Sequence, residues 1–356
     1  MGESQNKSAL IAMSGGVDSS AAAYLMQAGG FRCQGATMRL LGSDGGRNAA
    51  DAEAVCRRLG IPFMELDLVR EFEEAVIERF VRVYQAGGTP NPCVDCNRCM
   101  KFSRLLEAAE AAGLFYVATG HYARVSWDPR AGRWLLKKAL DAGKDQSYFL
   151  YTLTQRQLAR VQFPLGEMEK RQVRELAEGL GFANARRRDS QDICFIPGGD
   201  YGAFIEDYTG QSFPAGDFLD QTGRPVGRHK GAVRYTLGQR KGLGLSMGEP
   251  VYVCGKDMAA NTVTVGPESA LYAREILVED LNWIAVEDLR GPLRVKVKTR
   301  SRQREQPAWI YPGAEVRIVF EFPQRAVTPG QAAVFYDGDT VVGGGTIVEA
   351  LAETEG

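Results

Sequence analysis

A glycine-rich loop near the N-terminus has the residue types that bind phosphate groups. Residues 14–20 read SGGVDSS and lie between a short apolar run and a segment of helical composition. Glycines let the backbone turn tightly and approach a ligand, and the N–H groups that begin a helix donate hydrogen bonds to anions. The carboxylate of Asp18 would repel phosphates unless a cation such as Mg²⁺ lay between them. We predict a pyrophosphate-binding loop, with an ordinary serine-capped turn as the alternative.

The same loop argues against two common nucleotide-binding motifs. It lacks the lysine of G-x-x-x-x-G-K-[ST], and its glycines do not have the spacing of G-x-G-x-x-G. Neither a Walker-type NTPase nor a dinucleotide-binding site is therefore expected.

Cysteine spacing indicates a second chemical site. The chain has seven cysteines and no recognisable export signal, so a disulfide framework is not expected. Cys93, Cys96 and Cys99 recur at every third position, which indicates either thiol chemistry or a metal site. With only two histidines in the chain, hydrolase triads that depend on an imidazole base are not expected.

A fourth cysteine, Cys194, lies in the apolar run ICFI, which fits either a small buried residue or a reactive thiol. The cations Arg186, Arg187 and Arg188 precede it. Because cationic groups lower the pKa of a thiol, we predict that this basic run lies near Cys194.

Two basic segments are typical of a surface that binds polyanions, although the net charge of the chain is only −1. No acidic residue occurs between Asp220 and Glu249, a stretch with six arginines and lysines. Further along the chain, cations occupy every second position: Arg294, Lys296, Lys298, Arg300, Arg302 and Arg304. A β-strand over this stretch would present all of them on one face, where nucleic acid phosphates would match them. The alternative is a solvated edge strand that its charges protect from aggregation.

The elements that must position these residues change in type along the chain. The length of 356 residues favours two or three domains. Strand and helix patterns alternate over residues 1–207, with helices predicted over 71–87 and 169–181 and a strand over 115–123. This alternation predicts an α/β domain with a Rossmann-like parallel sheet, which binds ligands at the carboxyl ends of its strands.

The rest of the chain differs in composition and in the pattern of its apolar residues. Residues 208–273 are rich in glycine and predict a small, loop-rich middle domain. Short β-rich runs over 274–356 predict a C-terminal β-barrel. No run approaches the roughly 18 apolar residues that span a bilayer, so we expect no membrane association and a cytoplasmic protein.

Several segments, in order along nearly the whole chain, resemble one known family. The loop 14–20 is similar to the pyrophosphate loop of the ATP pyrophosphatase superfamily, whose members adenylate a carbonyl-type oxygen before a nucleophile displaces AMP. The segments that resemble the tRNA-specific 2-thiouridylases are NPCVDCN (91–97), TGHYA (119–123), KDQSY (144–148), DSQDICF (189–195), YTLGQR (235–240) and PGQ (329–331).

The resemblance implies ATP-dependent thiolation of the wobble uridine, U34, of tRNA, giving 2-thiouridine, AMP and pyrophosphate. Cys194 matches the family's persulfide carrier, and Cys96 matches the partner that assists sulfur release or forms a transient disulfide. Positions matching ATP contacts are Ala12, Met13, Ser14, Gly15, Gly16, Val17, Asp18, Ser19, Met38 and Gly120.

Other matches concern the RNA. Asn91, Pro92 and Cys93 match the loop that faces the target base. Positions matching tRNA contacts are His121, Lys144, Asp145, Gln146, Arg300, Ser301 and Gln331. The implied partners are tRNAs of the Lys, Glu and Gln types and a persulfide sulfur donor or relay protein.

The cysteine cluster departs from the family pattern. The family commonly has Asp at the position of Cys93, and Cys99 is additional. The spacing resembles ferredoxin-type runs, so Cys93, Cys96 and Cys194 could hold a [4Fe-4S] cluster whose open iron position binds the sulfur. A structural zinc is a third version. The persulfide and cluster versions both use Cys96 and Cys194 on an ATP-activated tRNA.

Two other functions stay open at this point. A small-molecule ligase of the same loop superfamily, similar to argininosuccinate synthase, would need neither Cys194 nor the alternating cations. A non-catalytic RNA-binding protein with an idle nucleotide loop would release no pyrophosphate from ATP in the presence of tRNA.

Overall fold

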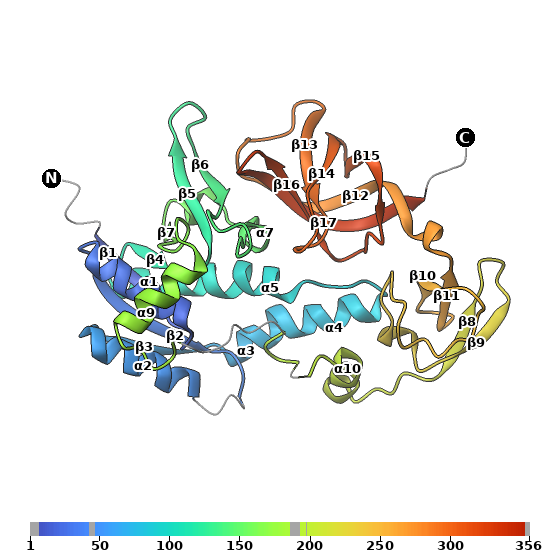
Figure 1. Ribbon diagram of the computed structural model, residues 1–356, viewed down its shortest axis with the longest axis horizontal. Coiled ribbons are helices and arrows are strands. Elements are labelled where there is room, and N and C mark those ends of the chain that lie inside the picture. Colours follow the sequence, from blue (N-terminus) through green and yellow to red (C-terminus); the bar gives the residue numbers. More distant parts are fainter. Residues whose placement is uncertain (1–6, 43–46, 186–192, 197, 353–356) are drawn as a thin grey trace.

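The chain folds into three regions, which the computed structural model describes over residues 7–42, 47–185, 193–196 and 198–352. Figure 1 shows an α/β layer at the N-terminal end, a small sheet at the opposite end, and a barrel above the helices that join the two.

A five-stranded parallel sheet forms the centre of the N-terminal region, in the order β3-β2-β1-β4-β7. Its strands are β1 (Ser8–Ala12), β2 (Arg32–Arg39), β3 (Phe63–Asp67), β4 (Tyr116–Ala118) and β7 (Val161–Gln162). All four pairings are parallel, which confirms the predicted α/β class. The segments that follow β1 and β4 therefore emerge at the same edge of the sheet.

Helices cover both faces of this sheet. Ala9 and Ile11 of β1 face a core shared with α1, α2 and α9, whereas Leu10 faces a core shared with α6. The alternation follows from the two-residue period of a strand that is buried on both sides. The covering helices are α1 (Val17–Ala28), α2 (Arg47–Leu59), α6 (Leu105–Ala111) and α9 (Lys170–Gly179).

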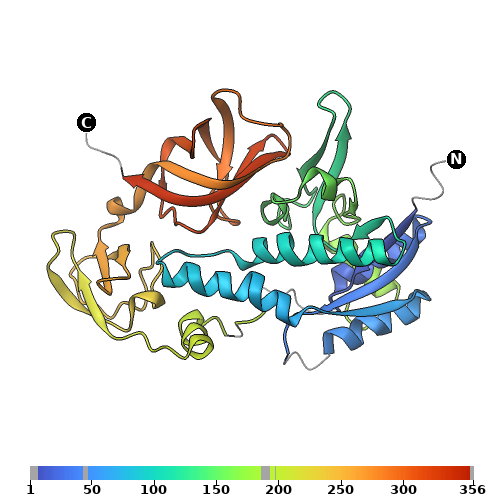
Figure 2. The same cartoon turned by 180° about the vertical axis from the view of Figure 1, so that it is seen from behind.

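Two long helical runs lie side by side between the sheet and the small sheet at the other end (Figures 1 and 2). The first, predicted over 71–87, consists of α3 (Val69–Phe72), the π-helix η1 (Glu73–Ile77) and α4 (Glu78–Gln85). The second was not predicted. It consists of α5 (Pro92–Asp95), the π-helix η2 (Cys96–Arg104) and α6.

The strand predicted over 115–123 is wrong in length. β4 ends at Ala118, and the chain resumes as the hairpin β5 (Ala123–Asp128) and β6 (Arg133–Lys138). β6 pairs with the C-terminal strand β17 through Lys137 and Thr340. Ion pairs reinforce this junction, at 3.0 Å between Arg124 and Asp339 and at 2.6 Å between Lys138 and Glu305.

Three further short helices precede the middle sheet: α7 (Ser147–Leu150), α8 (Gln155–Leu158) and α10 (Tyr201–Thr209). The middle region, predicted as loop-rich, contains a four-stranded sheet in the order β10-β11-β8-β9 and two short 3₁₀ helices. Its core includes Phe218, Val253 and Val263. The elements are β8 (Gly216–Leu219), β9 (Pro225–His229), η3 (Ala232–Arg234), β10 (Tyr252–Asp257), β11 (Thr262–Gly266) and η4 (Glu268–Leu271).

The C-terminal region is a six-stranded antiparallel barrel, as predicted. The strand order β12-β15-β14-β13-β16-β17 closes through pairing of β12 with β17. Its strands are β12 (Tyr272–Trp283), β13 (Leu293–Lys298), β14 (Gln306–Tyr311), β15 (Val316–Arg325), β16 (Ala332–Asp337) and β17 (Thr340–Ala352).

The six alternating cations do not form one continuous strip. Arg294, Lys296 and Lys298 lie on one face of β13, opposite the buried Val295 and Val297. The strand then ends, and Arg300, Arg302 and Arg304 belong to a loop over residues 299–305. Arg294 also pairs with Glu321 at 2.7 Å across the barrel surface. The prediction is therefore correct for three of the cations and wrong for the three that follow.

None of the helices among the described residues is long and apolar enough to cross a membrane.

Candidate active site

The predicted pyrophosphate loop is a tight turn between β1 and α1. Gly15 has a φ of 72°, and a Cβ there would lie 2.8 Å from the carbonyl oxygen of Asn48, so the position requires glycine. The hydroxyl of Ser19 donates to the carbonyl of Gly16 at 2.9 Å and accepts from the N–H of Ser14 at 3.2 Å. These bonds close the turn over the N-terminus of a twelve-residue helix, where N–H groups can receive an anion.

The other predicted ATP contacts surround this turn. Ala12 ends β1, Met13 follows it, and Met38 lies near the carboxyl end of the adjacent β2. Val17 and Met13 are buried in the core, so any contact with ATP would come from their backbone. Gly120 packs directly on the loop, because a Cβ there would lie 2.7 Å from the carbonyl carbon of Asp18 and 2.8 Å from the nitrogen of Ser19.

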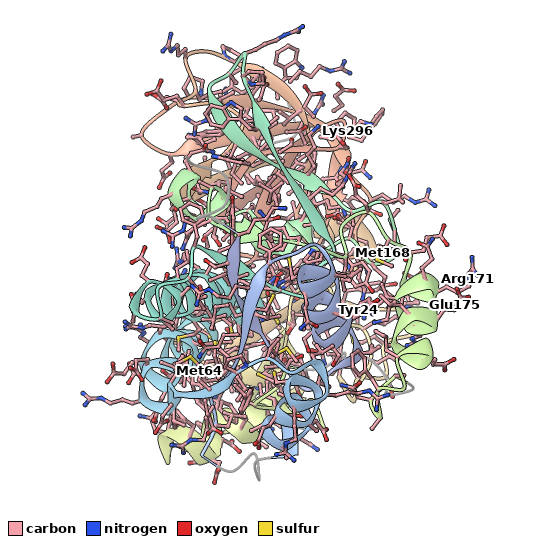
Figure 3. All side chains as sticks on the ribbon, turned by 90° about the vertical axis from the view of Figure 1, so that its left-hand side faces the viewer. Tyr24, Met64, Met168, Arg171, Glu175 and Lys296 are labelled. Carbon is pink, nitrogen blue, oxygen red and sulfur yellow. The ribbon has the colours of Figure 1, made fainter. Side chains whose placement is uncertain are left out.

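Asp18 is held by two residues that the sequence did not single out. Lys170 donates to both carboxylate oxygens at 2.7 Å, and the hydroxyl of Tyr122 donates to one of them at 2.8 Å. Lys170 begins α9 with a side chain only 10% exposed, whereas its neighbours Arg171 and Glu175 stand out from the helix surface (Figure 3). The loop therefore has a buried cation beside its carboxylate.

Asn184 supports the loop from behind. Its Nδ2 donates to the carbonyl of Gly15 and to the hydroxyl of Ser20, both at 2.9 Å. The side chain is 8% exposed. Asn184 lies ten residues before Cys194, so the segment that leads to the predicted sulfur carrier also fixes the predicted ATP loop.

The cysteine motif begins the helical run over residues 92–111, the cysteine helix. Pro92 occupies its first position, where a missing N–H costs nothing, and Asn91 is the N-cap residue. Cys93 and Cys96 are three residues apart and share a face, but Cys93 is exposed whereas Cys96 is buried. Cys99, further along in the π-helix η2, is partly exposed.

Cys194 is exposed beside a well-packed anchor. Phe195, the next residue, is buried against Phe72 and Phe80, with ring centroids 5.8 Å and 5.2 Å away. The same apolar core includes Cys96, which brings the Cys194 segment to the cysteine helix. Residues 186–192, with the predicted basic run and the start of the DSQDICF motif, lie outside the described residues.

The thiols influence each other electrostatically. Burial raises the pKa of Cys96 to about 11, the charge of Lys101 opposes this rise, and those of Cys194, Cys93 and Cys99 add to it. Burial also raises the pKa of Cys93 and of Cys194, each opposed by Lys101. The charge of Lys101 therefore lowers the pKa of all three thiols. The sequence analysis did not identify this residue.

The iron–sulfur and zinc versions both need side chains placed to hold a metal ion. Among the residues that the structure describes, no group of three or more His, Cys, Asp or Glu side chains is placed to hold a metal ion. The assignment of Cys93, Cys96 and Cys194 as cluster ligands stays a prediction. The same applies to the zinc version.

His121 connects the loop region to the cysteine helix. It follows Gly120, its ring packs 5.7 Å from that of Phe102 in η2, and its Nδ1 lies 2.7 Å from the hydroxyl of Thr119. Burial, with a smaller contribution from Lys101, holds its pKa well below the usual value. The imidazole is therefore neutral at physiological pH.

The predicted tRNA contacts 144–146 form a turn with structural hydrogen bonds. The carboxylate of Asp145 accepts from the N–H of Ala139 at 3.1 Å and from the hydroxyl of Ser147 at 2.8 Å. Gln146 accepts from the N–H of Tyr122 at 2.9 Å, which links the turn to the tyrosine that contacts Asp18. Lys144 is half-buried.

Gln331 of the barrel reaches the chain just before the cysteine helix, whereas Arg300 bonds within the barrel. Gln331 donates to the carbonyls of Thr89 and Pro90 at 2.9 and 3.1 Å, just before Asn91. Arg300 donates to the carbonyl of Ala326 at 2.7 Å, and Ser301 follows it in the loop 299–305. The predicted RNA-contacting residues thus come from both sides of the junction between the helices and the barrel.

Three family models match successive parts of the chain. They are described as the tRNA methyl transferase HUP domain (residues 7–198), the tRNA methyl transferase PRC-barrel domain (202–267) and the aminomethyltransferase β-barrel domain (273–347).

Several relatives match almost from end to end. The tRNA-specific 2-thiouridylase MnmA of Acetivibrio thermocellus is 45% identical over 355 residues, covering 96% of this chain and 99% of its own. The enzyme of the same name from Heliobacterium modesticaldum is 47% identical, with 96% and 92% covered. That of Clostridioides difficile is 43% identical, with 97% and 99% covered.

Proposed function

The chain belongs to the tRNA-specific 2-thiouridylase family, and we propose that it uses ATP to replace the C2 oxygen of U34 in tRNA with sulfur. One observation carries this proposal. The segment 119–121 contacts the loop 14–20 through Gly120 and the cysteine helix through His121, so the proposed nucleotide and thiol sites would adjoin. A small-molecule ligase would need only the first of these sites.

The first stage activates the base. The C2 oxygen of the uridine attacks the α-phosphorus of ATP, the α–β phosphoanhydride bond breaks, and pyrophosphate leaves. The helix N-terminus and Lys170 supply positive potential where the leaving group gains negative charge. Mg²⁺ fits here, because it needs only one or two carboxylates besides phosphate oxygens. Asp18, whose side chain is 31% exposed, would hold the ion. The ion would neutralise phosphate charge.

The second stage delivers sulfur. The terminal sulfur of a Cys194 persulfide attacks C2, and AMP leaves with the electrons of the C2–O bond. The Cys96 thiol attacks the sulfur of Cys194, the bond to the transferred sulfur breaks, and the thiol proton passes to the departing 2-thiouridine. The products are 2-thiouridine and a Cys96–Cys194 disulfide, which a dithiol reductant must reopen.

Exposure supports this division of roles. A donor protein or small persulfide can reach Cys194, which is exposed, whereas Cys96 is buried. Donor docking at Cys194 is part of the proposal, as are substrates of the Lys, Glu and Gln tRNA types. A tRNA substrate also agrees with the cytoplasmic location expected from the sequence.

The decisive assay gives the purified chain tRNA, Mg²⁺, ATP and a persulfide source, and measures AMP, pyrophosphate and 2-thiouridine by nucleoside mass spectrometry. All three products should appear in equal amounts. Asp18→Ala should abolish turnover with little effect on the Kd for tRNA. Pyrophosphate release without tRNA would favour the small-molecule ligase, and tRNA binding without pyrophosphate would favour an idle RNA-binding protein.

The cluster version has its own test. Anaerobic purification, iron and acid-labile sulfide analysis, and the same thiolation assay would be done on one preparation. Full turnover by iron-free protein would support the persulfide version. Turnover that rises in proportion to iron content would support the cluster version.

A further inference from the structure

The barrel exposes an aromatic ring where its strand pattern should bury one. On β15, Val316, Ile318 and Phe320 alternate into the core, and Gln324 is buried as well. Phe322 shares this spacing but is 64% exposed. Exposure of a phenylalanine forfeits the free energy of burying its ring, so the outward position calls for a reason.

A wide irregularity in strand pairing turns Phe322 outward. Glu275 of β12 pairs with Val319, and Ala273 pairs with Gln324, so Arg274 alone lies opposite the four residues 320–323. Arg274 donates to the carbonyl of Phe320 at 3.2 Å and so stays within the bulge. Bulges of this kind re-aim side chains and recur next to functional sites.

A chain of hydrogen bonds fixes the bulge to the arginine loop 299–305. The Oε1 of Gln303 accepts from the N–H and hydroxyl of Thr299 at 3.0 and 2.7 Å. The Nε2 of Gln303 donates to the Oε1 of the buried Gln324 at 3.0 Å. Gln324 in turn donates to the carbonyl of Phe322 at 2.6 Å. The backbone of Phe322 is therefore held beside the loop in a defined place.

The loop 299–305 contains three arginines and one acidic residue. Residues 299–304 read TRSRQR, and Arg302 and Arg304 are both exposed. The one acidic residue of the loop, Glu305, is paired with Lys138. An exposed aromatic ring on a strand that is bonded to an arginine-bearing loop can bind an unpaired nucleotide, with the base on the ring and the phosphates on the cations.

We propose that Phe322 is a base-stacking platform for an unpaired nucleotide of the bound tRNA, with Arg302 and Arg304 on the flanking phosphates. The inference rests on the proposed function, because it takes tRNA as the occupant. It goes beyond that function by assigning RNA recognition to a ring that the family match did not include. A docking site for a protein sulfur donor is the competing occupant, which the arginines favour less than RNA.

The test measures the Kd of the full chain for an anticodon stem-loop RNA over a range of salt concentrations. Phe322→Ala should raise the Kd about tenfold, because base–aromatic stacking contributes about that much, and should leave the salt slope unchanged. Phe322→Trp should retain affinity. Arg304→Gln should reduce the slope of log K against log salt by about one. Since Phe322 is exposed, the Tm of each variant should match that of the unaltered chain.

Two controls make the result specific. Trp309→Ala removes another exposed barrel ring, 39% exposed, opposite the ion-paired Arg294, and should change the Kd less than twofold. A fully paired RNA duplex offers no unpaired base, so Phe322→Ala should not weaken its binding. An unchanged Kd in Phe322→Ala, an equal loss with Trp309→Ala, or an equal loss on the duplex would each overturn the proposal.

A protein occupant would give a different pattern. Phe322→Ala would then slow thiolation only with a protein sulfur donor, and not with a small persulfide, at an unchanged Kd for RNA; this too would overturn the proposal. Failure of the proposed function is separate, because it would appear as absence of 2-thiouridine with the unaltered chain.

Discussion

At the scale of single residues, Lys170 shows what a local pattern cannot reveal. The composition of the loop 14–20 indicates phosphate binding, whereas a lysine at the start of an amphipathic helix gives no sign of a function. Only the fold brings its ammonium within 2.7 Å of Asp18, from a position 152 residues away. A cation in that place balances the carboxylate and lies where the β- and γ-phosphates are proposed to bind.

We expect Lys170→Met to lower the rate of tRNA-dependent pyrophosphate release about 100-fold or more, the cost of removing one preorganised positive donor from a charge-developing site. The Kd for tRNA should change less than twofold. Arg171→Met is the matched control, because Arg171 pairs at 2.8 Å with Glu175 on the outer face of the same helix. Equal losses in both variants would mean that α9 is merely destabilised.

The two sulfur residues differ in exposure, which the motif alone could not show. Sequence spacing and resemblance pointed to Cys96 and Cys194, but not to which thiol solvent reaches. Burial in the core around Phe80 and Phe195 explains why Cys96 is protected and why its pKa rises. The thiol form is therefore the resting state of Cys96 at neutral pH.

The pH dependence of Cys96 can be measured directly. Its pKa is raised from 9.0 to about 11, so its rate of alkylation in the folded chain should climb about tenfold per pH unit and level off near pH 11. Peptide mass spectrometry after iodoacetamide treatment would follow the site, with the urea-unfolded chain levelling near pH 9 as control. A raised thiol pKa stabilises the fold below pH 9, and this contribution is lost as the pH rises toward 11. A plateau near pH 9 in the folded chain would contradict the assignment.

At the scale of elements, the spacing of apolar residues predicted the helices and strands that bury one face or both faces. The parallel sheet, α9 and the barrel strands follow from such patterns. The helix over 92–111 was missed because proline, polar residues and three cysteines begin it, and its π-helical turn depends on packing against the neighbouring run. The cationic strand was predicted too long, because nothing in an alternating pattern marks where Thr299 and Gln303 turn the chain away.

Packing of Gly120 on the loop gives a prediction at this scale. Gly120→Ala places a methyl group within 2.7 to 2.8 Å of backbone atoms of Asp18 and Ser19, so the loop must shift. We expect ATP binding about tenfold weaker and a free energy of unfolding lower by about 1–3 kcal/mol, measured by calorimetry and urea denaturation. Gly179→Ala, in open space on α9, should be neutral or slightly stabilising. Unchanged ATP affinity in Gly120→Ala would separate this residue from the site.

At the scale of the whole molecule, the barrel is tied to the cysteine helix at several points. The buried Asp95 of the cysteine helix pairs with Arg79 at 3.2 Å. Arg79 and Arg98 also pair with Asp280 of the barrel. Asp280 adopts a positive φ of 55° at a bulge in β12, which local sequence does not signal. Domain content was predictable from composition, but these contacts between domains depend on single side chains and were not.

Gln331 links the barrel to the chain just before Asn91. The resemblance implied a tRNA contact, yet both donors of its amide are directed to the carbonyls of Thr89 and Pro90. We expect Gln331→Glu, which keeps the shape but loses the donors, to lower kcat for thiolation about tenfold with ATP binding intact. Hydrogen exchange in the absence of tRNA should speed up at Thr89, whose N–H bonds to Pro329. Ser301→Ala, at a predicted tRNA contact outside this network, should leave that exchange unchanged. A loss of thiolation with unaltered exchange would instead assign Gln331 to direct contact with the RNA.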